Sequence, residues 1–180
     1  MRWGRYGGGV IAFFDRIGNG FSPSTYDTTS QNWHTIMGPT QTGPTALPLS
    51  GTYTYANVGG TKPTDNLGNV GTLNAATLVA DFDAQTVNTG VNLTLSGQTW
   101  AAGGTAIPIQ QRQYFEAGRD LSGAGNLNIC VGSTCGTSTL PTASSASTSG
   151  RIIGAFNGAS GQGLGMAYSL NQGGLTGTTV

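Results

Sequence analysis

The chain has 180 residues, and few of them combine a type and a spacing that could do chemistry. His34 is the only histidine, so a serine–histidine–acid triad could form only around it. It lies between Trp33 and Thr35 in an expected strand, and the sequence contains no Gly-x-Ser-x-Gly elbow. We interpret His34 as a half-buried or surface histidine without a catalytic role.

A pair of carboxylates can hydrolyse glycosides, and Asp81 and Asp83 are close in sequence. They flank Phe82 at the end of an expected strand, where acidic side chains usually lie in a solvated turn. The glycine-rich residues 158–163 look superficially like a phosphate loop, but they fall between two expected strands and no lysine follows. We expect no catalytic and no cofactor-binding residues, and we predict that the protein is not an enzyme.

Residues 64–69 read Thr-Asp-Asn-Leu-Gly-Asn and offer several oxygen ligands, which allows a calcium interpretation. The loop lacks the glutamate that closes an EF-hand. The other interpretation is an Asx-turn network in which Asp65, Asn66 and Asn69 bond to nearby backbone. The sequence favours this second interpretation, so we predict no metal site and leave calcium binding at residues 64–69 open.

Cys130 and Cys135 are the two cysteines, and four residues separate them. They are too few for a metal site, because His34 is far away in sequence. The simplest interpretation is a disulfide across a short turn; the alternative is two reduced thiols at a hairpin end. A disulfide indicates an oxidising, extracytoplasmic compartment.

Composition excludes several classes of protein. Only 8% of the residues are charged, Lys62 is the only lysine, and the formal net charge is zero, so no field gathers nucleic acid or anionic lipid. No apolar run approaches the length of a membrane-spanning helix, and we expect no membrane insertion. The start of the sequence lacks a signal-peptide pattern, so we expect a domain excised from a longer parent.

Alternation of apolar and polar residues predicts short strands with little helix. The clearest strand covers residues 87–96, and we expect a two-residue type II′ turn at Gly97-Gln98 before the return strand. Residues 17–24, 59–71 and 141–150 look like turns or loops, and residues 110–121 could hold one or two helical turns. Further strands are expected at residues 10–16, 32–37, 50–58, 74–82, 99–102, 126–131, 136–140, 151–157 and 164–170.

These elements favour an all-β fold, an antiparallel β-barrel of about eight strands. The chain has few charged side chains to protect exposed strand edges from pairing with other chains, and closing the barrel removes such edges. We expect a single domain over residues 1–180, with residues 171–180 as a frayed or incomplete tail. Five large side chains should fill its interior and leave little room for a small ligand: Phe13, Phe82, Leu93, Phe156 and Met166.

Several short motifs also occur in a familiar order. They include Trp-Gly-Arg-Tyr-Gly-Gly-Gly at residues 3–9, Trp-His-Thr-Ile-Met-Gly-Pro at residues 33–39, Ala-Asp-Phe at residues 80–82, Val-Asn-Leu-Thr-Leu at residues 91–95 and Gly-Ala-Phe-Asn-Gly at residues 154–158. This order resembles the C-terminal regions of FecR-domain-containing exported proteins of Gram-negative bacteria. More loosely, it is similar to the eight-stranded β-barrel of transferrin-binding protein B and related surface lipoproteins.

The resemblance implies a β-barrel at the cell surface, in the periplasm or in the secreted fraction of a Gram-negative bacterium. No FecR domain and no lipid-anchor cysteine accompanies it here, and Ala-Ser-Gly-Gln at residues 159–162 replaces the acidic, alanine-rich sequence of the lipoproteins. We carry over the fold and no binding residue. We expect a non-enzymatic domain that acts in protein–protein interaction, self-assembly or structure; the alternative is a barrel that binds a small ligand or serves iron uptake.

Overall fold

The computed structural model describes residues 2–8, 10–17, 20–27, 32–37, 43 and 50–173. Within these ranges the chain forms β-strands and one short 3-10 turn, and the described residues contain no α-helix. The elements are β1 Arg2–Gly7, β2 Val10–Ile17, β3 Gly20–Asp27, β4 Asn32–Met37, β5 Thr52–Tyr55, β6 Thr72–Asp81, β7 Thr86–Leu95, β8 Gln98–Gln110, β9 Tyr114–Arg119, β10 Asn128–Val131, η1 Ser133–Cys135, β11 Thr148–Asn157 and β12 Gly163–Gln172.

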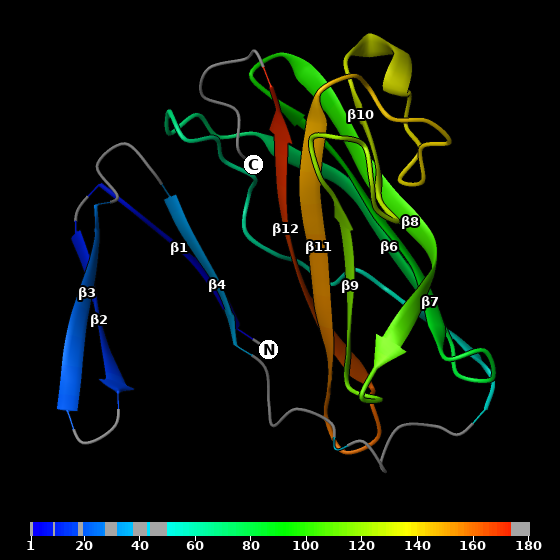
Figure 1. The fold of residues 1–180 in the computed structure, drawn as a ribbon, viewed down its shortest axis with the longest axis horizontal. Helices are drawn as coiled ribbons and strands as arrows, with labels where there is room; N and C mark the ends of the chain where they lie inside the picture. The colour runs from blue at the N-terminus through cyan, green and yellow to red at the C-terminus, as the bar shows by residue number, and fades with distance from the viewer. Residues whose placement is uncertain are drawn as a thin grey trace.

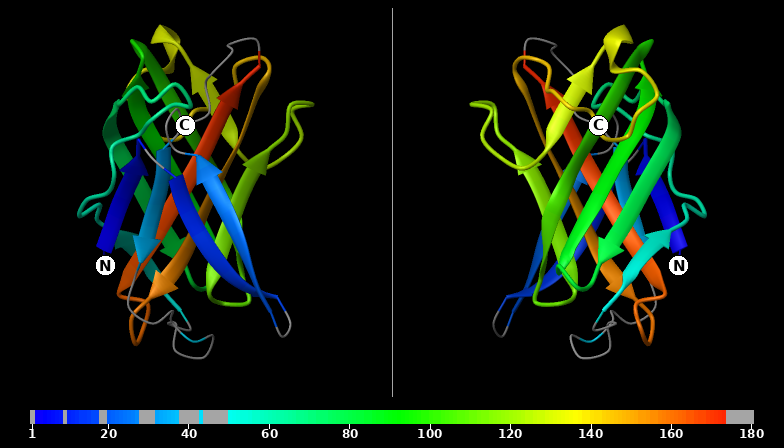
Figure 2. Two further views of the ribbon diagram at one scale, coloured as in Figure 1. Left: turned by 90° about the vertical axis from the view of Figure 1, so that its left-hand side faces the viewer. Right: turned by 90° about the vertical axis from the view of Figure 1, so that its right-hand side faces the viewer.

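Eight of the strands form one antiparallel sheet, in the order β12-β11-β9-β8-β7-β6-β5, with β10 also paired to β8. Figures 1 and 2 show that this sheet curls into a half-barrel. Among the described residues no ladder joins β12 to β5, so the half-barrel has an open side. The predicted all-β, antiparallel fold of about eight strands is confirmed.

Strand β7 shows how the sequence specifies the sheet. Its positions from 87 to 95 alternate, and the inward-facing Val87, Val91, Leu93 and Leu95 are all buried. The turn after it differs from the prediction, because it consists of Ser96 and Gly97 with φ of 51° and 77°. Two positive φ values make a type I′ turn, whose twist suits the flanking strands better than the type II′ turn expected one residue later.

A bulge helps the sheet to curl between β7 and β8. Val87 pairs with Ile107 but Thr89 pairs with Gly104, so β8 carries an extra residue here. Ala106 takes up the irregularity with a φ of 52°, and its N–H donates to the Asn88 side-chain oxygen over 2.8 Å. Bulges of this kind bend a strand and increase its twist.

Aromatic side chains fill the inside of the half-barrel. The ring of Phe156 lies 5.5 Å from that of Phe82, 5.8 Å from that of Tyr55 and 6.4 Å from that of Phe115. Trp100, on β8, is also fully buried. Phe82, Leu93 and Phe156 are buried as predicted, Met166 packs against them, and the side chain of Phe13 lies outside the described part of the chain.

Several predicted elements are wrong. Residues 110–121 hold a strand and not helical turns, because Phe115 and Ala117 alternate into the core while β9 pairs with β11. Residues 136–140 form no strand, because they cross the sheet instead of extending it. The predicted turn at residues 17–24 is shorter, since β3 begins at Gly20 and contains Pro23. A proline is tolerated there because β3 pairs on one edge only. Strand β1 was not predicted, and residues 174–180 of the expected tail lie outside the described residues.

The N-terminal strands form two separate ribbons. The β1–β4 pair lies beside β12 in Figure 1. The Ile36 side chain approaches Gly165 there. The β2–β3 hairpin is inserted between β1 and β4, and it stands apart from the eight-stranded sheet in Figure 1.

Candidate functional site

The loop at residues 56–71 brings His34 together with the polar residues singled out in the sequence. His34 extends from β4, and its Nδ1 and Nε2 lie 2.6 Å and 2.7 Å from the hydroxyl oxygens of Thr61 and Thr64. Partial burial, and then the positive charge of Arg5, lower the pKa of His34 below its ordinary value of 6.5. A neutral ring donates one of these hydrogen bonds and accepts the other, so His34 joins β4 to this loop.

Asp65 organises the tip of the same loop. One carboxylate oxygen accepts the Leu67 and Asn69 N–H groups, and the other accepts the Asn69 amide and the Ser96 hydroxyl. Asp65 is only 3% exposed. Burial alone would raise its pKa, but these hydrogen bonds outweigh it and lower the pKa below 3.8.

The interpretation of this loop as an Asx turn is therefore confirmed at Asp65, whose side chain bonds to the Leu67 and Asn69 backbone. The Asn69 side chain bonds instead to the Asp65 carboxylate. No cluster of three or more histidine, cysteine, aspartate or glutamate side chains suited to a metal occurs in the part of the chain that the structure describes.

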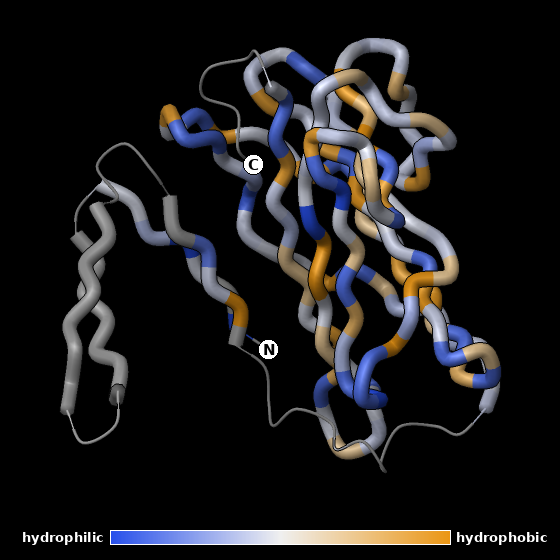
Figure 3. The backbone as a smooth tube through the Cα atoms, in the orientation of Figure 1, coloured by the Kyte–Doolittle hydropathy of each residue, from blue (hydrophilic) through white to orange (hydrophobic). Residues whose placement is uncertain are grey.

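Apolar side chains project from this loop. Val58, Leu67 and Val70 are 82%, 68% and 48% exposed. Val70 is held in a bridge with Thr64, and the Gly71 N–H donates to the Pro63 carbonyl over 2.8 Å, so hydrogen bonds close the backbone of residues 63–71. Figure 3 shows hydrophobic stretches along this loop. We call residues 56–71 the apolar loop.

The two carboxylates considered for catalysis serve separate turns. Asp81 accepts the Ala84 N–H over 2.9 Å, and Asp83 accepts the Gly51 N–H over 3.0 Å. The structure therefore does not bring them together with His34 as one polar cluster. Of the glycine-rich residues 158–163, residues 158–162 form the predicted loop between β11 and β12, and Gly163 begins β12. The Tyr55 hydroxyl donates to the Gly161 carbonyl in this loop over 2.7 Å.

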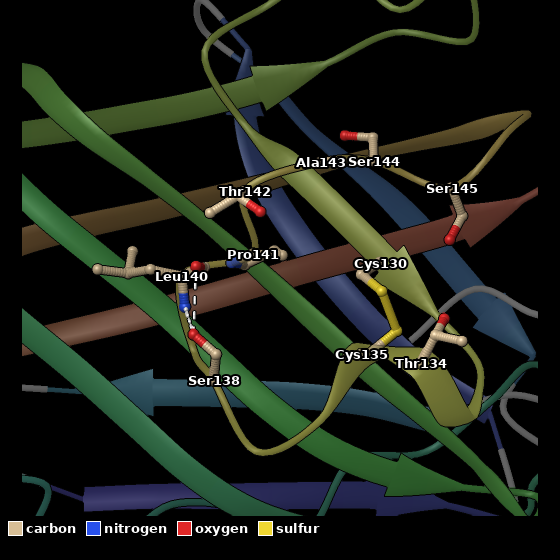
Figure 4. Close-up of a pocket in the computed structure, with 10 residues that line it drawn as sticks. All are labelled: Cys130, Thr134, Cys135, Ser138, Leu140, Pro141, Thr142, Ala143, Ser144 and Ser145. Atoms are coloured by element: carbon tan, nitrogen blue, oxygen red, sulfur yellow. Dashed lines mark hydrogen bonds between the residues drawn. A yellow bond between two sulfur atoms is a disulfide. The ribbon is translucent and has the colours of Figure 1, made fainter.

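The predicted disulfide between Cys130 and Cys135 is confirmed. It joins the end of β10 to η1 and borders a pocket of about 410 Å³, shown in Figure 4. Two serines of the pocket lining also support β10, because Ser144 and Ser145 accept the Ile129 and Val131 N–H groups. A disulfide of this kind is typical of proteins that mature in an oxidising, extracytoplasmic compartment.

Residues 136–141, called the strap below, cross the outer face of β7 and β8, a feature that sequence reasoning missed. The buried Asn92 side chain donates to the carbonyls of Gly136 and Ser138, each over 3.1 Å. The Thr139 carbonyl lies against Gly90 and Gly103, where any Cβ would overlap it. The one available signal was the glycines inside the two strands, Gly90 in β7 and Gly103 and Gly104 in β8. A glycine inside a strand often marks a close backbone approach.

No protein-family model, curated protein or solved structure matches this chain. The resemblance to FecR-domain-containing proteins and to transferrin-binding protein B therefore stays a prediction. The described residues include no helix long and apolar enough to cross a membrane.

Proposed function

We propose that this chain is a non-enzymatic, extracytoplasmic β-barrel domain that acts through contact with other protein chains, in recognition or assembly. The observation that carries the proposal is the apolar loop, where Val58, Leu67 and Val70 are exposed and hydrogen bonds close the backbone around the last two. The protein holds these side chains in water at a cost, and a partner surface would remove that cost. Zero formal net charge leaves no long-range repulsion against such a partner.

The titratable side chains support this reading over an enzymatic one. His34 and Asp65 hold the apolar loop by hydrogen bonds, whereas Asp81 and Asp83 hold other turns. General acid–base catalysis needs such groups to converge on one reacting atom. Their observed work is structural, so the apolar loop is the stronger functional candidate.

We also propose a specific cellular location for the protein, which the disulfide alone does not indicate. The Cys130–Cys135 bond fits any oxidising compartment. The order of the short motifs supports the surface or the secreted fraction of a Gram-negative bacterium, with the periplasm as the alternative.

A photo-crosslinking amino acid placed at Leu67 tests the function. The variant is expressed in the organism that makes the protein, and a matched variant carries the same group at Ile153, an exposed apolar residue on β11. We expect an adduct with another protein chain, identical or different, at position 67 and a much weaker one at position 153. Equal labelling at both positions, or no adduct at either, would contradict the proposal.

The alternative of a barrel for a small ligand or iron uptake has less support. Phe82, Phe115 and Phe156 occupy the space that a ligand would need. A thermal-shift screen with haem, siderophores and fatty acids tests it, and a reproducible rise in melting temperature with one of them would favour this alternative.

A further inference from the structure

The Cys130–Cys135 disulfide fixes the point from which the strap starts. Cys130 lies in β10, and Cys135 ends η1 directly before Gly136, the first strap residue. Gly132 and Gly136 flank η1 with φ of 110° and 60°, so the chain turns sharply on both sides of it. The hydrogen bond from the Cys135 N–H to the Gly132 carbonyl is long, at 3.3 Å. The disulfide is therefore the covalent constraint that holds η1 against β10.

The two ends of the strap are held in different ways. Next to Cys135, the Asn92 side chain on β7, which is only 1% exposed, donates to the carbonyls of the first and third strap residues. At the far end, the Asn128 side chain on β10 donates to the Pro141 carbonyl over 3.0 Å. The bonds to Asn92 depend on the position of η1, because Gly136 directly follows it. Loss of the disulfide therefore frees the strap first at its Asn92 end.

A pocket gives small molecules access to the disulfide. Both cysteines belong to its lining, as Figure 4 shows, and its volume of about 410 Å³ is in the range of small-molecule sites. Thr134, Thr142 and Ala143 of the lining are exposed, so the pocket opens to solvent, and none of the described lining residues is charged. Cys130 is partly exposed whereas Cys135 is 8% exposed, so Cys130 is the more accessible of the two.

We propose that the Cys130–Cys135 disulfide is a reducible latch for the strap, opened by a small dithiol that reacts with it from the pocket. A thiolate of the dithiol attacks the Cys130 sulfur, the bond between the two cysteines breaks, and Cys135 leaves as a thiolate that takes up a proton. The second thiol of the reagent then displaces Cys130 from the mixed disulfide. Two electrons and two protons pass to the protein, which gains two thiols, and the reagent becomes a cyclic disulfide. The strap then lifts at Gly136 and exposes Asn92 to water.

This inference goes beyond the proposed function and does not depend on the apolar loop. The first test measures reduction of the disulfide by dithiothreitol in the whole chain, at several urea concentrations below the unfolding transition. Free thiols are alkylated and counted by mass. If the reagent reaches the disulfide through the pocket of the folded protein, the rate constant should stay within about two-fold across the series. If the disulfide reacts only after global unfolding, the rate constant should rise with urea in parallel with the unfolding constant.

A pair of tryptophan variants tests the route through the pocket. Ala143→Trp places a large ring on the exposed part of the lining and should slow the reaction with dithiothreitol several-fold. The matched control is Ala84→Trp, at an exposed position in the turn between β6 and β7, which should leave the rate unchanged.

The side-chain amides of Asn92 and Asn128 report on the two ends of the strap. After reduction, and in the variant with both cysteines replaced by serine, NMR should show the Asn92 amide protons exchanging with water faster by about ten-fold or more, since the short closed loop is gone. The Asn128 amide protons, at the end that stays attached, should change by less than about two-fold.

Any of four outcomes overturns the inference. The first two concern access: a reduction rate that follows global unfolding in urea, or equal rates in the two tryptophan variants. The third is unchanged exchange at Asn92 after reduction, which would show that the strap does not depend on the disulfide. The fourth is equal acceleration at Asn92 and Asn128, which would show that the whole segment opens and not one end of it.

Discussion

The position of the strap against two glycines predicts a large effect from a single methyl group. Gly90 on β7 pairs with Gly103 on β8, and the Thr139 carbonyl oxygen lies over both. In Gly90→Ala the new Cβ would overlap this oxygen and would lie 3.0 Å from the Ala102 carbonyl oxygen. Both are backbone atoms, so no side-chain rotation relieves the overlap.

The loss of stability in Gly90→Ala depends on whether the strap stays in place or moves away from the sheet. If the strap stays, the overpacking costs about 1–3 kcal/mol. If it lifts, the protein loses the two Asn92 hydrogen bonds and the 2.7 Å contact between the hydroxyls of Thr77 and Thr139, each worth about 1 kcal/mol. The two routes give similar totals, so we expect Gly90→Ala to lower the free energy of unfolding by about 1–3 kcal/mol.

Urea unfolding followed by tryptophan fluorescence measures this change, with thermal unfolding as a second readout at about 2–4 °C per kcal/mol. Gly60→Ala is the matched control, because nothing lies within 4 Å of its added Cβ, and it should change stability by less than about 0.5 kcal/mol. The double variant of Gly90 and Gly103 should cost less than the sum of the two single variants, since one carbonyl opposes both. Equal stability of Gly90→Ala and Gly60→Ala would refute the reasoning.

The remaining predictions concern the disulfide, the core and His34. Replacing Cys130 and Cys135 with serine should remove about 2 kcal/mol of stability in urea unfolding, because the closed loop is short; a loss above that of Phe156→Ala would contradict this. Phe156→Ala should cost about 3–5 kcal/mol in the same assay, since the ring contacts three other aromatic rings; a loss below about 1 kcal/mol would contradict the packing. Folding lowers the pKa of His34, so its contribution to stability is complete above pH 6.5 and decreases as the pH falls below that value. The protection factors of the β4 amides, which compare measured exchange with the intrinsic rate at each pH, should fall on acidification in the natural chain and stay constant in His34→Gln; the same fall in both would show that His34 is not responsible.

Much of the sheet could be predicted from the sequence because its signals are local. The alternation of β7 and the apolar run of β2 each lie within one strand, and both strands were found. The disulfide was also predictable, since a spacing of five residues fits a single turn. Strand β9 was missed because Gln, Arg and Glu around it have helical propensity, which the packing of Phe115 and the ladder with β11 override.

The candidate site was less predictable, because its contacts join distant segments. His34 lies 27 residues from Thr61 and 30 residues from Thr64, and no spacing rule connects them. The strap was missed for the same reason, since its partners Asn92 and Gly90 lie more than 40 residues earlier in the chain. Only the Asx turn at Asp65 was predictable, because its partners Leu67 and Asn69 follow directly.

Strand β8 joins two parts of the protein that could respond differently to mechanical force. Its ladder with β7 runs along most of the strand, whereas on the other edge β10 pairs only from Asn128 to Val131 and β9 at just two positions, Phe115 and Tyr114. A load that pulls β9–β12 away from β5–β8 would break these few hydrogen bonds one after another and not all at once. We therefore expect the pairing of β8 with β9 and β10 to separate first under tension. The amides that form this pairing should need a smaller opening free energy for hydrogen exchange than the amides between β7 and β8.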